Sequence, residues 1–152
     1  MPANWTAGGL VGFDERLRRA LSTPGARCAV LAVGLDAGAD EPAAADALGR
    51  QLRGCDAMAY FGPGRFLICL ADLSDDEAAA ESARAMLHAL RANASIGVAA
   101  AYPGATPGTL IAAADREMSA VKRNGGNGIK LASPWPARSS QGPRPFAILE
   151  SA

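Results

Sequence analysis

The sequence predicts one α+β domain, in which helices flank a central, mostly antiparallel sheet. Apolar stretches of strand length alternate along the chain with longer amphipathic stretches of helix length. Within this alternation, the Gly-Pro-Gly turn at 62–64 directly separates two apolar stretches, so the strands on either side should pair as an antiparallel hairpin. The chain of 152 residues is long enough for one domain with a buried core.

The first part of the chain is predicted to form a helix, a strand and a second helix. Apolar residues at helical spacing predict a short amphipathic helix over 13–21, and the sequence TPGA ends it. A continuous apolar run with β-branched residues predicts a buried strand over 27–35. Pro42 is suited to the first turn of a helix, which predicts that 40–53 is helical.

The second part of the chain begins with the hairpin, whose strands are predicted at about 56–61 and 65–71. A helix, a strand, a helix and a short strand follow, at 74–92, 95–102, 107–123 and 129–133. Ser74 and Glu77 have the spacing of a capping box at the start of the long helix. The tail at 133–152 is rich in Pro and Ser and is predicted to be mostly linker, although FAILE at 146–150 can dock as an edge strand. We therefore divide the chain into a domain at 1–132 and a tail at 133–152.

Composition argues against several classes of protein. The 15 basic residues equal the 15 acidic ones, so nothing points to nucleic acid or to a membrane surface. No apolar run is long enough to span a bilayer, and MPANWTAGGLVGF lacks the basic start and compact apolar stretch of a signal peptide. Cys28, Cys55 and Cys69 are odd in number and form no CxxC pair, which argues against a disulfide framework or a metal site. Their small or apolar neighbours predict buried free thiols, and we expect a cytoplasmic protein.

Three stretches together carry a resemblance to a known family. CDAMAYFGPGRFLICL (55–70), SIGVA (95–99) and LIAAADREMSAVKRNGGN (110–127) stand in the order and at the spacing of a signature hairpin, a strand and a helix. They resemble GGDEF domains, the bacterial diguanylate cyclases, over roughly residues 10 to 132. The resemblance implies a central, mostly antiparallel sheet wrapped by helices, similar to the palm of polymerases and nucleotide cyclases. This fold agrees with the element order predicted above.

The resemblance also shows where this chain departs from active members, which hold two magnesium ions and GTP through carboxylates. Gly34 stands at the position of the Asp that ends the family's first strand, and Asp36 falls on a second, less critical position. Gly64 and Arg65 stand at the acidic positions of the hairpin turn. A guanidinium repels cations and offers no acceptor, so this turn should hold no metal pair. We predict that the chain is not an enzyme and has no catalytic residue or cofactor, with Arg65 as a solvated turn residue.

The part of the family that reads guanine and contacts phosphate is altered as well. The stretch DAGADEPAAADALG, between the strand at 27–35 and the next helix, is too short for the family's guanine-reading loop and contains no Asn. Lys122 matches a Lys that contacts phosphate in the family, but Gly126 replaces the Arg expected beside it. The predicted loss of catalysis therefore extends to the substrate site.

A different family feature is present. RGCD, from Arg53 to Asp56, precedes Gly62 by five residues, which is the spacing of the family's inhibitory site for its product, cyclic di-GMP. The planar fork of an Arg can pair with O6 and N7 of guanine, and its face can stack on a base. A carboxylate accepts from N1 and N2 on guanine's other edge. The alternative is a local Arg–Asp ion pair that caps the end of a helix.

Arg84 is the third candidate binding residue. It lies eighteen residues after Phe66, the spacing of a secondary inhibitory-site Arg in the family. The alternative for Arg84 is a solvated helix residue that pairs with Glu77 or Glu81.

We therefore interpret the chain as an inactive GGDEF domain that binds cyclic di-GMP through Arg53, Asp56 and Arg84. As a receptor it would signal to an unidentified protein partner, and intercalated ligand molecules could link two chains into a homodimer. The alternative from another class is a scaffold for dimerisation or protein contact that binds no nucleotide. A third and weaker interpretation is an enzyme with residual cyclase activity.

Overall fold

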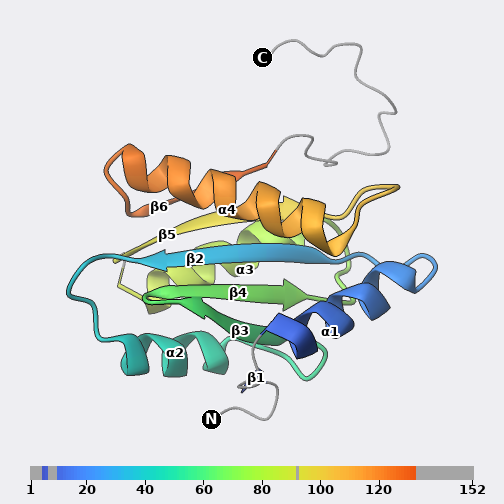
Figure 1. Cartoon of the computed structure of the whole chain (residues 1–152), viewed down its shortest axis with the longest axis horizontal. Coiled ribbons are helices and arrows are strands. Elements are labelled where there is room, and N and C mark those ends of the chain that lie inside the picture. The colour runs from blue at the N-terminus through green and yellow to red at the C-terminus, as the bar shows by residue number, and fades with distance from the viewer. Residues whose placement is uncertain (1–4, 7–9, 92, 133–152) are drawn as a thin grey trace.

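The computed structural model describes residues 5–6, 10–91 and 93–132. Its strands are β1 (Trp5–Thr6), β2 (Ala29–Leu35), β3 (Ala57–Gly62), β4 (Arg65–Leu70), β5 (Ala94–Ala100) and β6 (Gly128–Leu131). Its helices are α1 (Leu10–Ser22), α2 (Glu41–Arg50), α3 (Glu77–Ala89) and α4 (Pro107–Arg123). The strands form one sheet in the order β1-β3-β4-β2-β5-β6 (Figure 1). The outer pairs, β1 with β3 and β5 with β6, are parallel and the others are antiparallel, which confirms the predicted fold class.

Each helix and strand predicted from the sequence is present, with ends that shift by a few residues. The long helix begins at Glu77 rather than at 74, so the predicted capping box is wrong. Asp75 instead accepts a hydrogen bond from the backbone N–H of Ala78 at 2.9 Å, and supplies the cap that the sequence assigned to Ser74. The sequence did not predict β1, because a strand of two residues shows no alternation. The predicted tail, including FAILE at 146–150, lies outside the described residues.

Helices cover both faces of the sheet, and this accounts for the continuous apolar runs in its central strands. One core cluster joins α2 and α3 to one face, around Leu31, Leu48 and Ile96. The other cluster joins α1 and α4 to the opposite face, around Phe13, Leu67 and Leu110. All seven residues of β2 and all seven of β5 are buried, so these strands form the centre of the domain. No helix in the described part of the chain is long and apolar enough to cross a bilayer.

The backbone of α4 lies directly against β5 at Gly97. A Cβ atom at this position would lie 2.0 Å from the carbonyl oxygen of Ala114 and 2.5 Å from the backbone nitrogen of Met118. Real side chains do not tolerate such distances to backbone atoms, so α4 can come this close only over a glycine. This contact sets the distance between α4 and the sheet.

We expect Gly97→Ala to lower the free energy of unfolding by at least about 2 kcal/mol, because the methyl group would push α4 away from the sheet. Urea unfolding followed by circular dichroism measures the change. The matched control is Gly108→Ala, in the first turn of α4, where a Cβ atom meets only Thr106 Oγ1 at 3.9 Å. This control should be neutral or slightly stabilising. Equal unfolding midpoints for Gly97→Ala and the parent would contradict the packing described here.

Candidate functional site

The turn between β3 and β4 is held in place by side chains from two helices. Arg65 Nη2 lies 2.6 Å from Asp115 Oδ1 on α4, and the guanidinium carbon lies 5.3 Å from the centre of the Phe61 ring. The prediction that Arg65 is a solvated turn residue is therefore confirmed only in part, because its side chain is 41% exposed but is bonded to Asp115. The physical reason is that α4 brings a carboxylate to one side of the guanidinium, while β3 offers an aromatic face.

The backbone of the same turn is engaged by α2 and β2. The N–H of Gly64 donates to the carboxylate of Glu41, in the first turn of α2. The carbonyl of Gly64 accepts from the N–H of Leu35 at 2.8 Å. Gly64 has a φ of 69°, a backbone conformation that favours glycine. Two carboxylates from helices, Glu41 and Asp115, therefore approach a turn that has no acidic side chain of its own.

The space above Gly34, at the end of β2, is filled. In the sheet register Gly34 pairs with Arg65 on one side and with Ser95 on the other. A Cβ atom at Gly34 would lie 2.6 Å from both Met118 Sδ and Lys122 Cε. Lys122 Nζ donates to the carbonyl of Leu35 at 2.9 Å, so its ammonium group lies where an acidic side chain from this strand would point.

The described residues offer no metal site at this edge. Within 5–6, 10–91 and 93–132, no three His, Cys, Asp or Glu side chains are close enough to hold a metal ion together. The charged group that covers Gly34 is instead the ammonium of Lys122 on α4, and Gly64 is followed in the turn by the guanidinium of Arg65. The carboxylates that do reach the turn, those of Glu41 and Asp115, are bonded to the Gly64 N–H and to Arg65 and are not grouped as the oxygen ligands that magnesium prefers.

Arg53 and Asp56 lie in the turn between α2 and β3, and the structure joins them closely. Asp56 Oδ2 accepts from the backbone N–H of Arg53 at 2.8 Å and from its Nε at 3.1 Å. Asp56 Oδ1 accepts from Arg53 Nη2 at 3.0 Å and from the backbone N–H of Ala71 at 3.1 Å. The Asp56 side chain is 1% exposed and that of Arg53 is 49% exposed. The carboxylate is thus the buried anchor of the pair, and the guanidinium is its accessible part.

The bond to Asp56 raises the pKa of Arg53 above its ordinary value, so the guanidinium stays charged. Two further groups approach the same turn without having been predicted. Arg16, on α1, donates through Nη2 to the backbone carbonyl of Asp56 at 3.1 Å. The thiol of Cys55 lies 3.5 Å from the carbonyl of Ala71. Neither contact has a sequence signal, because each joins residues that are far apart in the chain.

Arg84, the third predicted residue, is engaged elsewhere. On α3 its Nη2 lies 3.5 Å from Glu77 Oε2, and both side chains are more than half exposed. This is one of the two partners that the sequence left open as the alternative for Arg84. An exposed pair of this kind contributes little to stability, about 0–1 kcal/mol, so Glu77 can release Arg84 at small cost.

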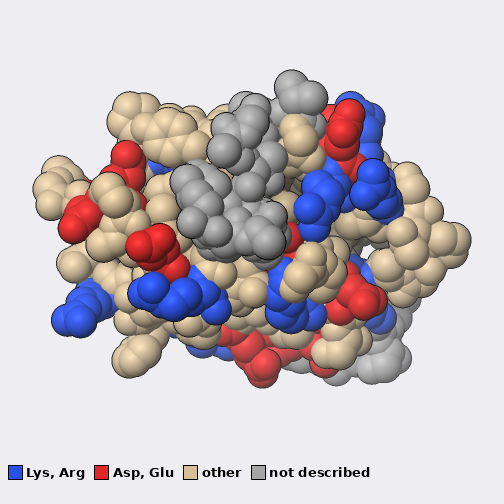
Figure 2. Space-filling model, turned by 90° about the horizontal axis from the view of Figure 1, so that it is seen from below, with Lys and Arg blue, Asp and Glu red and all other residues tan. Residues whose placement is uncertain are grey.

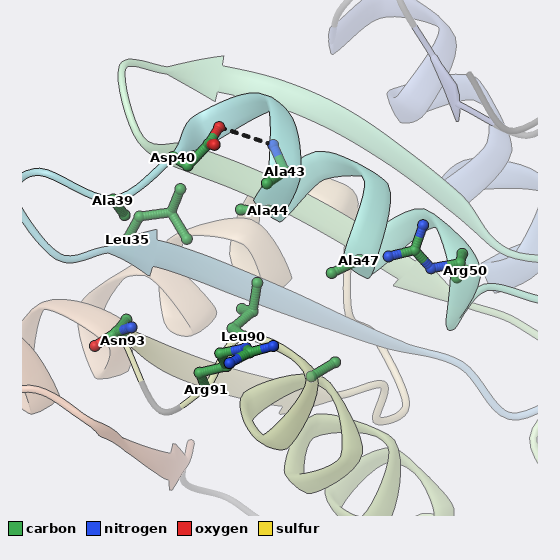
Figure 3. Close-up of a pocket in the computed structure, with 11 residues that line it drawn as sticks. Leu35, Ala39, Asp40, Ala43, Ala44, Ala47, Arg50, Leu90, Arg91 and Asn93 are labelled. Atoms are coloured by element: carbon green, nitrogen blue, oxygen red, sulfur yellow. Dashed lines mark hydrogen bonds between the residues drawn. The ribbon is translucent and has the colours of Figure 1, made fainter.

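A groove that was not predicted from the sequence lies between α2 and the end of α3 (Figure 3). Its volume is about 330 Å³. It is lined by small apolar, larger apolar and polar residues: Leu35, Ala39, Asp40, Ala43, Ala44, Ala47, Arg50, Ala89, Leu90, Arg91 and Asn93. The groove is a second candidate site, and its lining does not include Arg53 or Asp56.

Charged side chains of both signs are interspersed on the face of the molecule seen from below Figure 1 (Figure 2). The described part of this face therefore shows no continuous basic surface of the kind that binds nucleic acid. This agrees with the equal numbers of basic and acidic residues in the sequence.

Solved structures place the fold among GGDEF domains, although no protein-family model and no curated protein matches the chain. The GGDEF domain of PA1120 (YfiN or TpbB) from Pseudomonas aeruginosa is 26% identical, with a TM-score of 0.74 over 84% of this chain and 97% of that one. The GGDEF domain of DgcB from Caulobacter crescentus, solved in complex with c-di-GMP, is 18% identical, with a TM-score of 0.68 over 86% and 96%. Diguanylate cyclase SiaD from Pseudomonas aeruginosa, solved with its activator SiaC, is 19% identical, with a TM-score of 0.70 over 80% and 57%.

The cysteines differ in exposure, which corrects one prediction. Cys28 and Cys69 are buried as expected, but Cys55 is exposed, because it lies in the turn after α2 and not in the buried sheet. All three are free thiols, as the sequence predicted. Burial is the main cause that raises the pKa of Cys28 to about 11 and the pKa of Cys69 to about 12.

We expect a thiol reagent such as DTNB to modify Cys55 alone in the folded protein at neutral pH, because thiolates react and the two buried thiols stay protonated. Partial burial and then the charge of Asp56 also raise the pKa of Cys55, so its rate should increase as the pH rises. Cys55→Ala should remove the reaction of the folded protein, and denaturation of the parent should reveal three thiols. Equal rates for all three in the folded protein would contradict the burial described here.

Proposed function

We propose that this chain is a GGDEF-type domain that makes no cyclic di-GMP and instead binds it as a receptor. The observation that carries the proposal is the turn of Arg53 and Asp56, in which a buried carboxylate holds a half-exposed guanidinium in a fixed orientation. A guanidinium fixed in this way loses little conformational freedom when it meets a planar base. The proposal places the protein in the bacterial cytoplasm, where its three thiols would stay reduced.

The proposed loss of catalysis rests on the chemistry of phosphoryl transfer. That reaction needs divalent cations to neutralise the charge that develops on the phosphate. Gly34 has no room for a carboxylate, and Arg65 places a cation at the hairpin turn. Glu41 and Asp115, the acidic side chains that reach this turn, are bonded to Gly64 and Arg65.

The proposed ligand site uses the three residues named from the sequence. Arg53 would offer the face and the edge of its guanidinium to one guanine of the ligand. Asp56 is 1% exposed, so guanine can bond to it only by replacing some of the bonds that it now accepts from Arg53 and Ala71. Arg84 would leave Glu77 and contribute from α3 of the same chain or of a second chain.

The similar structures support the choice of ligand and the idea of a protein partner. The DgcB domain was solved in complex with c-di-GMP, and another similar structure is described as a novel interaction mode between a GGDEF domain and this dinucleotide. SiaD was solved with a protein activator. On this basis we propose that ligand-bound chains contact a protein partner or form a ligand-linked homodimer.

One observation favours the alternative, a scaffold that binds no nucleotide. The carboxylate of Asp56 has its hydrogen bonds satisfied by the protein itself, so the pair has a structural role even without a ligand. The two functions differ in whether the dinucleotide binds at all, and titration decides between them.

We expect no cyclic di-GMP when the pure protein is incubated with GTP and either magnesium or manganese, as measured by mass spectrometry of the nucleotides. The variant Gly64→Asp with Arg65→Glu, which returns two carboxylates to the turn, should also stay inactive. The reason is that Lys122 and Met118 still occupy the space above Gly34. Detectable product from the parent would refute the proposed loss of catalysis.

Calorimetric titration with cyclic di-GMP tests the receptor role. Arg53→Ala should weaken binding by about tenfold or more, since each charge-assisted hydrogen bond contributes about 1.5–3 kcal/mol. Asp56→Asn should also weaken binding, because its amide presents donors to a guanine edge that already donates. Arg84→Ala should have a smaller effect, mainly on ligand-linked dimerisation measured by light scattering.

The matched control for these variants is Arg18→Ala, which removes an exposed arginine that pairs with Asp14 on α1. It should bind as the parent does. Because Arg53→Ala leaves a buried carboxylate without its partner, thermal unfolding must show that each variant is folded at the temperature of titration. If the folded parent binds nothing at high micromolar ligand, or Arg53→Ala binds as tightly as the parent, the scaffold function replaces the receptor function.

A further inference from the structure

The groove between α2 and the end of α3 has a regular wall on one side. Asp40, Ala43, Ala47 and Arg50 recur at the spacing of one face of a helix, and Figure 3 shows them along the side of α2 that faces the groove. The small alanine side chains leave a slot between the two helices. An acidic residue stands at the start of this wall and a basic one at its end.

The opposite wall comes from the end of α3 and the segment that follows it. Leu90 supplies apolar surface, and Leu35 of β2 lies at the side of the sheet (Figure 3). Arg91 has a φ of 58°, which is uncommon for a residue with a side chain and places it just past the end of α3. Asn93 accepts a backbone hydrogen bond from Asp36 at 3.0 Å, which fixes the segment to the end of β2.

The groove is lined by two arginines and one aspartate, and of these side chains only that of the aspartate has a hydrogen-bond partner among the described residues. Arg50 and Arg91 are both exposed, and within the described part of the chain neither guanidinium has a hydrogen-bond or ion-pair partner. Asp40, the acidic residue of the lining, accepts from the backbone N–H of Ala43 at 3.1 Å and caps α2. The groove thus combines an apolar slot with two guanidiniums that have no ion-pair partner in the described part of the chain, against one carboxylate that caps α2.

We propose that this groove binds a small organic anion that has a flat, apolar body and one carboxylate, sulfonate or phosphate group. The flat body would lie between the alanines of α2 and Leu90, where it displaces water from apolar surface. The anionic group would meet Arg50 and Arg91, because guanidinium forks pair well with such groups. The site is separate from the one proposed for cyclic di-GMP and does not depend on it.

The probe for this site is 8-anilinonaphthalene-1-sulfonate, an aromatic anion whose fluorescence rises on apolar surface. We expect saturable binding to the folded parent with a stoichiometry of about one, weakened by added salt because the interaction is partly ionic. Arg91→Gly should weaken binding by about tenfold, the loss of one charge-assisted contact. Glycine is chosen because it adopts the positive φ of this position without strain. Ala47→Leu should remove binding by filling the slot.

Matched controls separate the groove from general surface binding. Arg19→Ala removes an exposed arginine of α1, which packs on the other face of the sheet, and Ala85→Leu adds the same bulk on an exposed position of α3 outside the groove lining. Both should bind the probe as the parent does. The neutral analogue N-phenyl-1-naphthylamine should bind more weakly than the anion and should not respond to Arg91→Gly.

Two results would overturn the proposal. One is the lack of saturable probe binding to the parent, and the other is unchanged binding in both Arg91→Gly and Ala47→Leu. Ala47→Leu should bind cyclic di-GMP as the parent does. The proposal for the groove and the proposal for the Arg53 site can therefore fail independently. Near-UV circular dichroism of every variant shows whether the fold is kept, since a loosened core also binds this probe.

Discussion

The close packing of α4 against the sheet is the constraint on which the rest of the structure depends. Because Gly97 has no side chain, the backbone of α4 lies directly on β5. Met118 and Lys122 then reach across to cover Gly34, and Asp115 comes within 2.6 Å of Arg65. Two glycines in neighbouring strands thus allow a helix to occupy the volume in which a metal-binding carboxylate of the sheet would have to lie.

The charge distribution at the hairpin turn follows from this arrangement. A cation extends from the turn itself, and the anions that compensate it come from the helices, through Asp115 on α4 and Glu41 on α2. In a metal-binding turn the anions would stand on the sheet and the cations would come from solution. The turn is therefore bonded to helices on both faces of the domain, and it links α2, β2 and α4.

The fold was predictable from the sequence because its signals are local. Apolar periodicity, Pro42 and the Gly-Pro-Gly turn specify elements over short stretches, and the same elements appear in the structure. The site was predictable only in part. The spacing of Arg53 and Asp56 is local, and their pairing at the end of a helix was foreseen as one alternative.

The burial of Asp56 depends on the backbone of Ala71, fifteen residues away, and Arg65 meets Asp115 across fifty residues. No local pattern specifies contacts of that length. The groove could not be predicted for the same reason. Its two walls, on α2 and at the end of α3, are far apart in the sequence.

The asymmetry of the Arg53–Asp56 pair decides what a ligand can do there. A buried carboxylate that loses its partners costs far more than an exposed guanidinium that loses one, so Asp56 will keep most of its bonds when anything binds. A ligand can therefore contact the exposed side of Arg53 at low cost, but it can reach Asp56 only by replacing some of the bonds that the carboxylate now accepts from Arg53 and from Ala71. The backbone carbonyl of Asp56 is bonded to Arg16, so a movement of this turn acts on α1 as well. Hydrogen bonds thus connect the exposed guanidinium of Arg53 to Asp56, and Asp56 to Arg16 on α1. This connection does not involve the hairpin turn between β3 and β4.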